Sequence, residues 1–232
     1  MIRNIYLTIR AIPKTIFFNF KYLPFKQAIK FPVLISHRVW LMKTKGKITI
    51  ETMDIKPAMI KIGFGEIGIF DAMRARSVWN VGGLIEFKGK ADFRHGVKIA
   101  VGDNGTLYVG NDVVLTAEST VMCNKEIVLE DMVGVSWESQ IMDTDFHPIY
   151  DKNHKLINGD EKVVIGAGSW IGSRVMILKG VNLPPRTMVA AGTLVSKASV
   201  RGMEGKEGIL IGGNPVKILK EDITFSVRHT TS

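Results

Sequence analysis

A six-residue repeat of aliphatic residues organises the second half of the chain. Every sixth position from residue 165 to residue 195 is Ile, Leu or Val, and a small or β-branched residue stands two positions before each later member. Residues two apart in a strand point to the same side, so both sets face one interior. The aliphatic positions are Ile165, Ile171, Ile177, Leu183, Val189 and Val195, preceded by Ser169, Val175, Val181, Thr187 and Thr193.

Two earlier runs keep the same spacing. They are Val109, Leu115, Val121, Ile127, Val133 and Ser139, and before them Val81, Phe87, Phe93 and Ile99. A period of six predicts a chain wound around a prism with one strand on each face. Extra residues in the turn-rich stretch 102–105 and between 139 and 165 predict turns or loops there. A β-sandwich is the alternative, but it requires turns about every 8 to 12 residues, which this sequence lacks.

The late repeats resemble those of a known family. The segment IGAGSWIGSRVMILKGVNLPPRTMVAAGTLV, followed by IGGNPVKILK, is similar to the hexapeptide-repeat acyltransferases, and the motif DTDFHPI resembles their sugar and polysaccharide O-acetyltransferase branch. The resemblance covers about residues 48–220. It implies an all-β fold, a left-handed parallel β-helix, which is an exception to right-handed crossovers. We expect this hexapeptide-repeat solenoid to carry a partly helical N-terminal segment and a C-terminal helix.

This interpretation divides the chain into three parts. Residues 1–47 form a basic amphipathic segment, residues 48–220 form the β-helix with a loop excursion at 140–163, and residues 221–232 form a C-terminal tail. A single cysteine, Cys123, excludes an internal disulfide and fits a reducing compartment. The sequence has no apolar run long enough to span a bilayer and no clean signal peptide, so we expect a cytoplasmic protein.

The net charge of +9 belongs to the N-terminal segment. The first 50 residues contain ten Lys or Arg and no acid, which leaves 21 bases against 22 acids in the remainder. Apolar residues there follow helical spacing, with prolines expected to divide the segment into short pieces. Three readings are open: peripheral contact with an anionic membrane, a cap on the open end of the solenoid, or recognition of an acidic substrate. No nucleic-acid-reading motif accompanies the charge.

His147 is the leading candidate for chemistry. It follows Asp143 and Asp145 at alternate positions, where the repeat loses its phase, so an extended segment would place all three on one side. An imidazole can take a proton from a sugar hydroxyl near neutral pH, and a neighbouring carboxylate, with Asp145 favoured, could orient it. A metal site or a loop anchor without chemistry are the alternatives. We expect no metal because this motif contains only one histidine and the chemistry of the family it resembles is metal-free.

The acyl donor is implied by the resemblance alone. Related enzymes bind coenzyme A in a groove between adjacent β-helices of a trimer, so we expect acetyl-CoA as co-substrate and a homotrimer. Small residues allow a ligand to approach the backbone closely. Lys217 and Lys220 would share a face if the C-terminus is helical. The matching cofactor-binding candidates are Trp170, Gly172, Ser173, Ala191, Gly192, Lys197, Pro215, Lys217 and Lys220.

The resemblance also implies polar acceptor-binding residues on neighbouring coils, for which Asn124, Trp137 and Asp143 are the candidates. The predicted function is transfer of an acetyl group from acetyl-CoA to a sugar hydroxyl in surface-polysaccharide or glycolipid assembly, with His147 as general base. Three alternatives remain: an N-acyltransferase that acts on an amino sugar, a non-catalytic trimeric scaffold, and a zinc-dependent hydratase.

Overall fold

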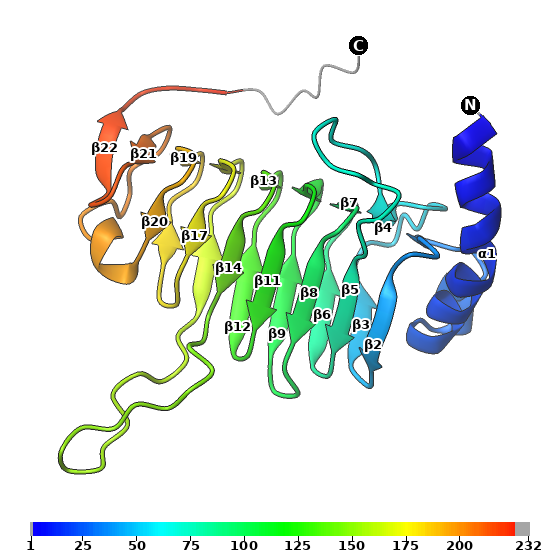
Figure 1. Ribbon diagram of the computed structural model, residues 1–232, viewed down its shortest axis with the longest axis horizontal. Coiled ribbons are helices and arrows are strands. Elements are labelled where there is room, and N and C mark those ends of the chain that lie inside the picture. Colours follow the sequence, from blue (N-terminus) through cyan, green and yellow to red (C-terminus); the bar gives the residue numbers. More distant parts are fainter. Residues whose placement is uncertain (1, 226–232) are drawn as a thin grey trace.

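A three-sided solenoid of short parallel strands forms the body of the molecule (Figure 1). The computed structural model describes residues 2–225, with side chains from Tyr6 onward, so His229 and the end of the predicted tail lie outside the described residues. In this part of the chain each turn of the solenoid contributes one strand to each of three sheets in succession. The predicted left-handed parallel β-helix is confirmed.

The three sheets have nine, seven and six strands in the described residues. Sheet 1 contains β1 (Val33–Ile35), β4 (Ile60–Phe64), β7 (Ala91–Arg94), β10 (Val113–Leu115), β13 (Gly134–Val135), β16 (Trp170–Ile171), β19 (Met188–Val189), β21 (Leu210–Gly212) and β22 (Lys217–Lys220). Sheet 2 contains β2 (Trp40–Thr44), β5 (Val78–Val81), β8 (Lys98–Val101), β11 (Thr120–Cys123), β14 (Gln140–Met142), β17 (Met176–Ile177) and β20 (Leu194–Val195). Sheet 3 contains β3 (Lys47–Ile50), β6 (Leu84–Phe87), β9 (Thr106–Val109), β12 (Glu126–Leu129), β15 (Val163–Ile165) and β18 (Asn182–Leu183).

The six-residue repeat fills the axis of the prism, as predicted. Each aliphatic member from Ile165 to Val195 ends a strand, and all six side chains are buried. The residues two positions earlier are buried as well. Ser169 and Thr187 satisfy their hydroxyls inside the core by donating hydrogen bonds to the Pro184 carbonyl. Strand alternation therefore accounts for both sets of positions.

Two helices close the N-terminal end of the solenoid. Helix α1 (Ile2–Tyr22) runs continuously through Pro13, so the prediction that this proline divides the segment is wrong, and α2 (Phe25–Ala28) follows Pro24. Phe18 packs edge-on against Trp79 of β5, with ring centroids 5.2 Å apart. The first coil begins at Val33, earlier than the predicted boundary at residue 48, because β1 already pairs in parallel with β4 of the next coil.

The C-terminal end differs from the prediction. The expected C-terminal helix is not formed in the described residues, because Lys217–Lys220 is strand β22, which pairs antiparallel with β21. A short 3₁₀ helix, η1 (Lys197–Val200), follows the last strand of sheet 2 instead. Pairing with β21 satisfies backbone groups at the end of sheet 1 that a helix at this position would leave free.

Candidate functional site

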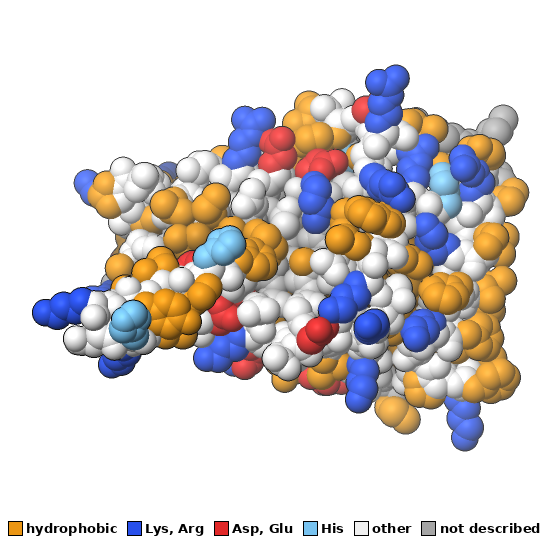
Figure 2. All heavy atoms as spheres, turned by 60° about the horizontal axis from the view of Figure 1, so that its bottom comes forward, with side chains coloured by type: hydrophobic (Ala, Val, Ile, Leu, Met, Phe, Trp, Pro, Cys, Tyr) orange, Lys and Arg blue, Asp and Glu red, His pale blue; other side chains and the backbone are white. Residues whose placement is uncertain are grey.

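A long loop, residues 143–162, leaves the prism between β14 and β15 and projects from the edge between sheets 2 and 3 (Figure 1). The predicted excursion at 140–163 includes residues that the structure assigns to strands, because Gln140–Met142 is β14 and Val163 begins β15. Figure 2 shows this loop standing away from the body, with histidine and apolar side chains at its surface.

Asp143 fixes the base of the loop. Its buried carboxylate accepts hydrogen bonds from the backbone N–H groups of Asn124, Lys125 and Glu126, at 2.7, 2.8 and 2.7 Å. These three residues form the corresponding corner of the preceding coil. A carboxylate that is fully buried and bound by three amides cannot meet a substrate, so the predicted substrate role of Asp143 is inconsistent with the structure.

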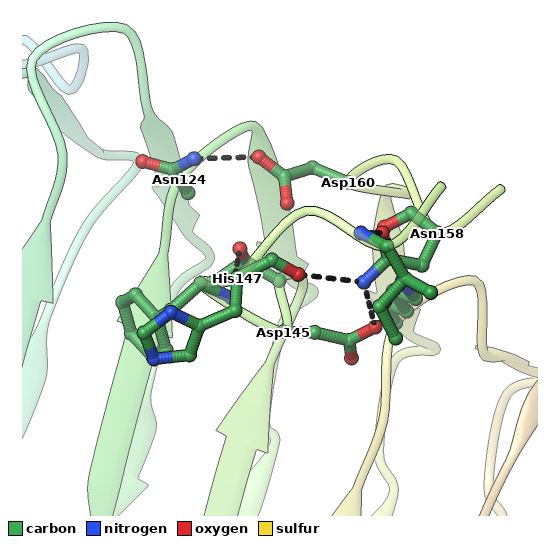
Figure 3. A network of polar contacts seen from close by, with 9 residues as sticks. Asn124, Asp145, His147, Asn158 and Asp160 are labelled. Carbon is green, nitrogen blue, oxygen red and sulfur yellow. Dashed lines mark hydrogen bonds and ion pairs between the residues drawn. The ribbon is translucent and has the colours of Figure 1, made fainter. Parts of the chain in front are cut away.

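His147 lies further out on the loop, with its side chain exposed. The segment is not extended as predicted, because Phe146 has a φ of 61° and turns the chain. The His147 backbone N–H donates to the Asp145 carbonyl oxygen at 2.7 Å, and the imidazole ring points away from the Asp145 carboxylate (Figure 3). The buried Asp143 and the exposed His147 therefore do not share one side of a strand.

The Asp145 carboxylate contacts Lys179 and Asn158 rather than the imidazole. Lys179 Nζ lies 2.5 Å from Asp145 Oδ2, and Asn158 Nδ2 donates to the same oxygen at 3.0 Å. The Lys179 ammonium, followed by the Asn158 amide, holds the pKa of the Asp145 carboxyl below its usual range. Asp145 thus fixes the loop through its own partners, and the prediction that it orients the imidazole directly is not supported by this geometry.

Coils on both sides of the loop hold its returning arm. From the preceding coil, the Asn124 side-chain amide donates to Asp160 Oδ2 at 2.5 Å, and from the following coil Lys179 Nζ donates to the Asn158 carbonyl at 2.6 Å (Figure 3). Lys197, at the start of η1, pairs with Glu161. Lys197 therefore lies on the edge that carries the loop, where it contacts the loop's own carboxylate.

A small hollow of about 140 Å³ lies beside His147's neighbour Phe146. Phe146 and Asn124 line it together with Lys43, Asn80 and Met122 from earlier coils. Asn124 and Phe146 are both exposed. The hollow places an aromatic ring and polar side chains next to the base of the loop, an arrangement that suits a polar acceptor with apolar ring faces.

Most predicted cofactor-binding residues gather on a different edge, between sheets 1 and 2. Trp170 begins strand β16 of sheet 1, and Gly172 and Ser173 follow this strand at the corner. Ala191 and Gly192 occupy the same corner one coil later. The Gly192 N–H donates to the Ser173 carbonyl at 2.9 Å, which joins the two corners. Five of the nine candidates are thus brought together, on an edge that does not carry His147.

Glycine occupies positions 172 and 192 of this group for different structural reasons. A Cβ at Gly172 would lie 2.6 Å from the Val189 carbonyl oxygen, so close stacking of coils requires glycine there. Gly192 has a φ of 72° and open space around a Cβ, so its backbone conformation favours glycine while its surface remains accessible. Gly192 and the exposed Ala191 are therefore better placed than buried Gly172 to meet a ligand.

Trp170 is half exposed on the outside of sheet 1. Its indole N–H donates to Ser136 Oγ at 2.9 Å, and its ring lies 5.8 Å from that of Phe225 in the C-terminal segment. Trp137 occupies the same edge as Ser173, one coil earlier, and its carbonyl accepts from the Arg174 N–H. Trp137 thus belongs with the cofactor candidates by position and lies on a different edge from Asn124.

The remaining candidates lie in the terminal hairpin. Pro215 is exposed in the turn between β21 and β22, and Lys217 and Lys220 are exposed in β22. Since this segment is a strand, the predicted helical face shared by the two lysines does not exist. The Gly212 backbone packs against Ala190, to whose side chain a Cβ would come within 2.7 Å, so the hairpin adjoins the edge that holds Ala191.

Sequence reasoning missed three residues of the loop network: Asn158, Asp160 and Lys179. They are polar residues in irregular segments, and only the closing of the loop brings them together. Cys123 is buried, and burial, with the Asp143 carboxylate nearby, raises the pKa of its thiol far above its ordinary value. Within the described residues no cluster of His, Cys, Asp and Glu is arranged to hold a metal ion.

Comparison with known proteins gives distant relatives. No protein-family model matches the chain. It is 29% identical over 140 residues to "Putative acetyltransferase YJL218W" of Saccharomyces cerevisiae, a match that spans 60% of this chain and 63% of the relative. The predicted resemblance to acetyltransferases is confirmed by this relative, although the match leaves more than a third of its length uncovered.

Solved structures of similar shape include the polysialic acid O-acetyltransferase OatWY, at 23% identity and a TM-score of 0.49, with 83% of this chain and 90% of that chain covered. A maltose O-acetyltransferase from Clostridium difficile 630 is 26% identical over 63% of this chain and 70% of that chain, with a TM-score of 0.35. At these levels of similarity, the function has to be argued from the residues of this chain.

Proposed function

We propose that this chain is an acetyl-CoA-dependent acetyltransferase that modifies a sugar hydroxyl of a polysaccharide or glycolipid, with His147 as the general base. The observation that carries the proposal is an exposed imidazole on a loop that buried Asp143 and the Asn158 contacts hold at its base. A catalytic base must be accessible to the substrate and held near it. The His147 imidazole is exposed, and hydrogen bonds to Asp145 and Asn158 hold its backbone.

The separation of the two edges supports a homotrimer. His147 projects from the edge between sheets 2 and 3, whereas Ser173, Ala191 and Gly192 lie on the edge between sheets 1 and 2. One chain alone does not bring these groups together. A three-fold arrangement places one edge of each copy beside the other edge of its neighbour, and such a head-to-tail contact closes into a ring. Each active site would then use two copies of the chain.

In the proposed reaction, His147 takes the proton of the acceptor hydroxyl as the oxygen attacks the thioester carbonyl carbon of acetyl-CoA. The tetrahedral intermediate then collapses, the carbon–sulfur bond breaks, and the imidazolium returns its proton to the departing thiolate. The products are the acetylated sugar and coenzyme A, with no acyl-enzyme. The hollow beside Asn124 and Phe146 offers a place for the acceptor ring next to the loop.

A pair of matched variants tests the role of His147. His147 and His154 are both exposed on the same loop, and His154 has no partner in the network that holds His147. We expect His147→Asn to lower kcat by at least about 100-fold, as loss of a general base does, with an unchanged melting temperature. His154→Asn should keep wild-type turnover. Equal turnover of the two variants would refute the assignment.

The acceptor is identified by an assay of free coenzyme A release with hydroxyl sugars, amino sugars, nucleotide sugars and lipid-linked sugars. Turnover only with amino sugars would replace the O-acetyl proposal by N-acylation. If calorimetry detected no binding of coenzyme A, the result would favour the alternative that the protein is a non-catalytic trimeric scaffold. Sedimentation of the purified protein measures the oligomeric state, and a monomer with full activity would contradict the shared active site.

A further inference from the structure

Helix α1 carries a second set of apolar residues on the side that faces away from the solenoid, in addition to the buried Ala11 and Phe18. The outer face, defined as Ile9, Ile12, Ile16, Phe17 and Phe20, has side chains between 45% and 59% exposed. Ile9, Ile12, Ile16 and Phe20 recur at three- and four-residue steps, so they form one stripe along the helix. A stripe of this kind would ordinarily pack against a protein core.

The inner side of the helix is partly polar. There Thr15 and Asn19 are buried and bond the free edge of strand β1. The Val33 N–H donates to Asn19 Oδ1 at 3.1 Å, Asn19 Nδ2 donates to the Val33 carbonyl at 2.7 Å, and the Ile35 N–H donates to Thr15 Oγ1 at 3.2 Å. The edge of the first coil therefore takes Thr15 and Asn19, and Phe18 packs inward beside them, whereas Ile9, Ile12, Ile16, Phe17 and Phe20 remain outside.

Aromatic residues extend the outer face beyond α1. The Phe20 ring lies 6.1 Å from the rings of both Phe25 and Phe31, and Phe25 is 70% exposed. Figure 2 shows apolar side chains gathered along the end of the molecule that carries α1, with Lys and Arg side chains beside them. The end of the solenoid is thus a continuous apolar surface rather than a set of scattered exposed residues.

Basic residues flank this surface on one side. Arg10 and Lys21 are exposed and stand eleven positions apart, close to three helical turns, so they share one flank of α1. Lys26 within α2 and Lys30 just after it are also exposed. The first 50 residues contain ten bases and no acid, so the charge at this end is not neutralised from within the segment.

The positive charge beside the outer face favours an anionic bilayer over a second copy of the chain as its binding partner. A second copy of the chain docked end to end would bring the exposed Arg10 and Lys21 of the two copies onto one interface, and like charges at an interface oppose association. An anionic bilayer offers apolar acyl chains to the outer face and negative headgroups to the basic flank. Within the described residues no helix is long and apolar enough to cross a membrane, so the contact would be at the surface.

We propose that the outer face of α1 docks the protein on the surface of a membrane that contains anionic lipid. Ile12, Ile16 and Phe20 enter the interface between headgroups and acyl chains, and Arg10 and Lys21 lie against the headgroups. The contact also suits an acceptor that is itself anchored in lipid. The proposal does not depend on acetyl transfer, because none of these residues belongs to the loop of His147.

Vesicle sedimentation of the full chain tests the proposal. The probes are phosphatidylcholine vesicles with and without about 30% phosphatidylglycerol, at about 0.1 M salt, where the Debye length is about 10 Å. We expect partitioning into the anionic vesicles to exceed that into the neutral ones by at least about tenfold, and to fall as salt rises. Equal partitioning into both kinds of vesicle, or none into either, would overturn the proposal.

Matched variants separate the apolar and basic contributions. The variant Ile12→Gln/Ile16→Gln/Phe20→Gln should lower partitioning at least about tenfold, because it removes the apolar contact. Its control, Met53→Gln/Ile69→Gln, removes exposed apolar residues elsewhere and should bind like the wild type. Arg10→Gln/Lys21→Gln should weaken binding and its salt dependence, whereas Lys152→Gln/Lys155→Gln should not. Binding unchanged in the apolar variant would refute the docking surface.

A labelled cysteine provides a second measurement. Cys123 is buried and is the only cysteine, so a cysteine introduced by Ile16→Cys can be labelled selectively with an environment-sensitive fluorophore. Anionic vesicles should shift its emission to the blue, and a label introduced by Lys206→Cys should not shift. His147→Asn should bind vesicles normally, which separates this result from failure of the proposed reaction. A lower sedimenting mass of the triple glutamine variant without lipid would instead assign the face to self-association.

Discussion

The side-chain amide of Asn158 donates a hydrogen bond to the backbone carbonyl oxygen of His147 at 2.8 Å, although eleven residues separate them (Figure 3). The same amide donates to the Asp145 carboxylate at 3.0 Å. Asn158 therefore joins the outgoing and returning arms of the loop at the point from which the imidazole projects. This makes it a positioning residue for His147.

Replacing Asn158 by Ala should lower kcat by about 10- to 100-fold, because small displacements of a catalytic group have effects of this size. The KM for acetyl-CoA should change little, since the cofactor candidates lie on another edge. Steady-state kinetics measure both values. Asn153→Ala is the control, because this loop residue uses only its backbone N–H in the network. Equal loss in kcat for both variants would show that Asn158 has no special role.

Replacing Asn19 by Leu should destabilise the N-terminal coil. The Asn19 side chain satisfies the buried N–H and carbonyl of Val33, and leucine of similar size would leave both unpaired. Unpaired buried groups cost about 1–3 kcal/mol each, so we expect a loss of about 3 kcal/mol in the free energy of unfolding. Urea titration measures it. Exposed Asn182 replaced by Leu should have little effect, and an unaltered midpoint for Asn19→Leu would contradict the capping role.

The Cys123 thiol should be unreactive in the folded protein. Burial, with the nearby Asp143 carboxylate, raises its pKa, and only the thiolate reacts with disulfide reagents. A chromogenic disulfide reagent at mildly alkaline pH should label no thiol in the native state and one thiol per chain in denaturant. Rapid labelling of the native protein would show that this coil opens or that the thiol is accessible.

Stability should fall on acidification because of His95. Burial lowers the pKa of its imidazole, and Nδ1 lies 3.0 Å from the Gly65 carbonyl oxygen. Below about pH 6.5 the unfolded chain binds a proton that the folded chain resists, so the free energy of unfolding decreases as the pH falls toward the lowered pKa. The slope for one histidine is at most about 1.4 kcal/mol per pH unit.

Urea titrations at pH 7 and pH 5 measure this effect. His95→Asn keeps a donor for the Gly65 carbonyl but does not titrate, so its stability should change less with pH than that of the wild type. His37, whose pKa is also lowered by burial and then by nearby Arg10 and Arg38, continues to titrate in this variant. The same pH dependence in the variant and the wild type would exclude His95 as a contributor.

The sequence by itself determined the repeating part of the fold. A six-residue period predicts which side chains point to the axis of the prism, because each face is one short strand whose inward positions must be apolar or small. The segment from Ile165 to Val195 therefore predicted both the strands and their buried sides. The loss of phase after Ser139 located the loop, and the position of His147 at that break identified it as the candidate base.

Only the tertiary structure decided how the non-repeating residues are used. Asp143 and Asp145 look equivalent beside His147 in the sequence, yet one is buried under three backbone amides and the other pairs with Lys179, from the next coil. The segment expected to form a C-terminal helix is instead a strand, because it pairs antiparallel with β21. Asn19 of α1 is buried because its side chain bonds the free edge of β1. These outcomes depend on contacts between residues far apart in the chain, which no local pattern records.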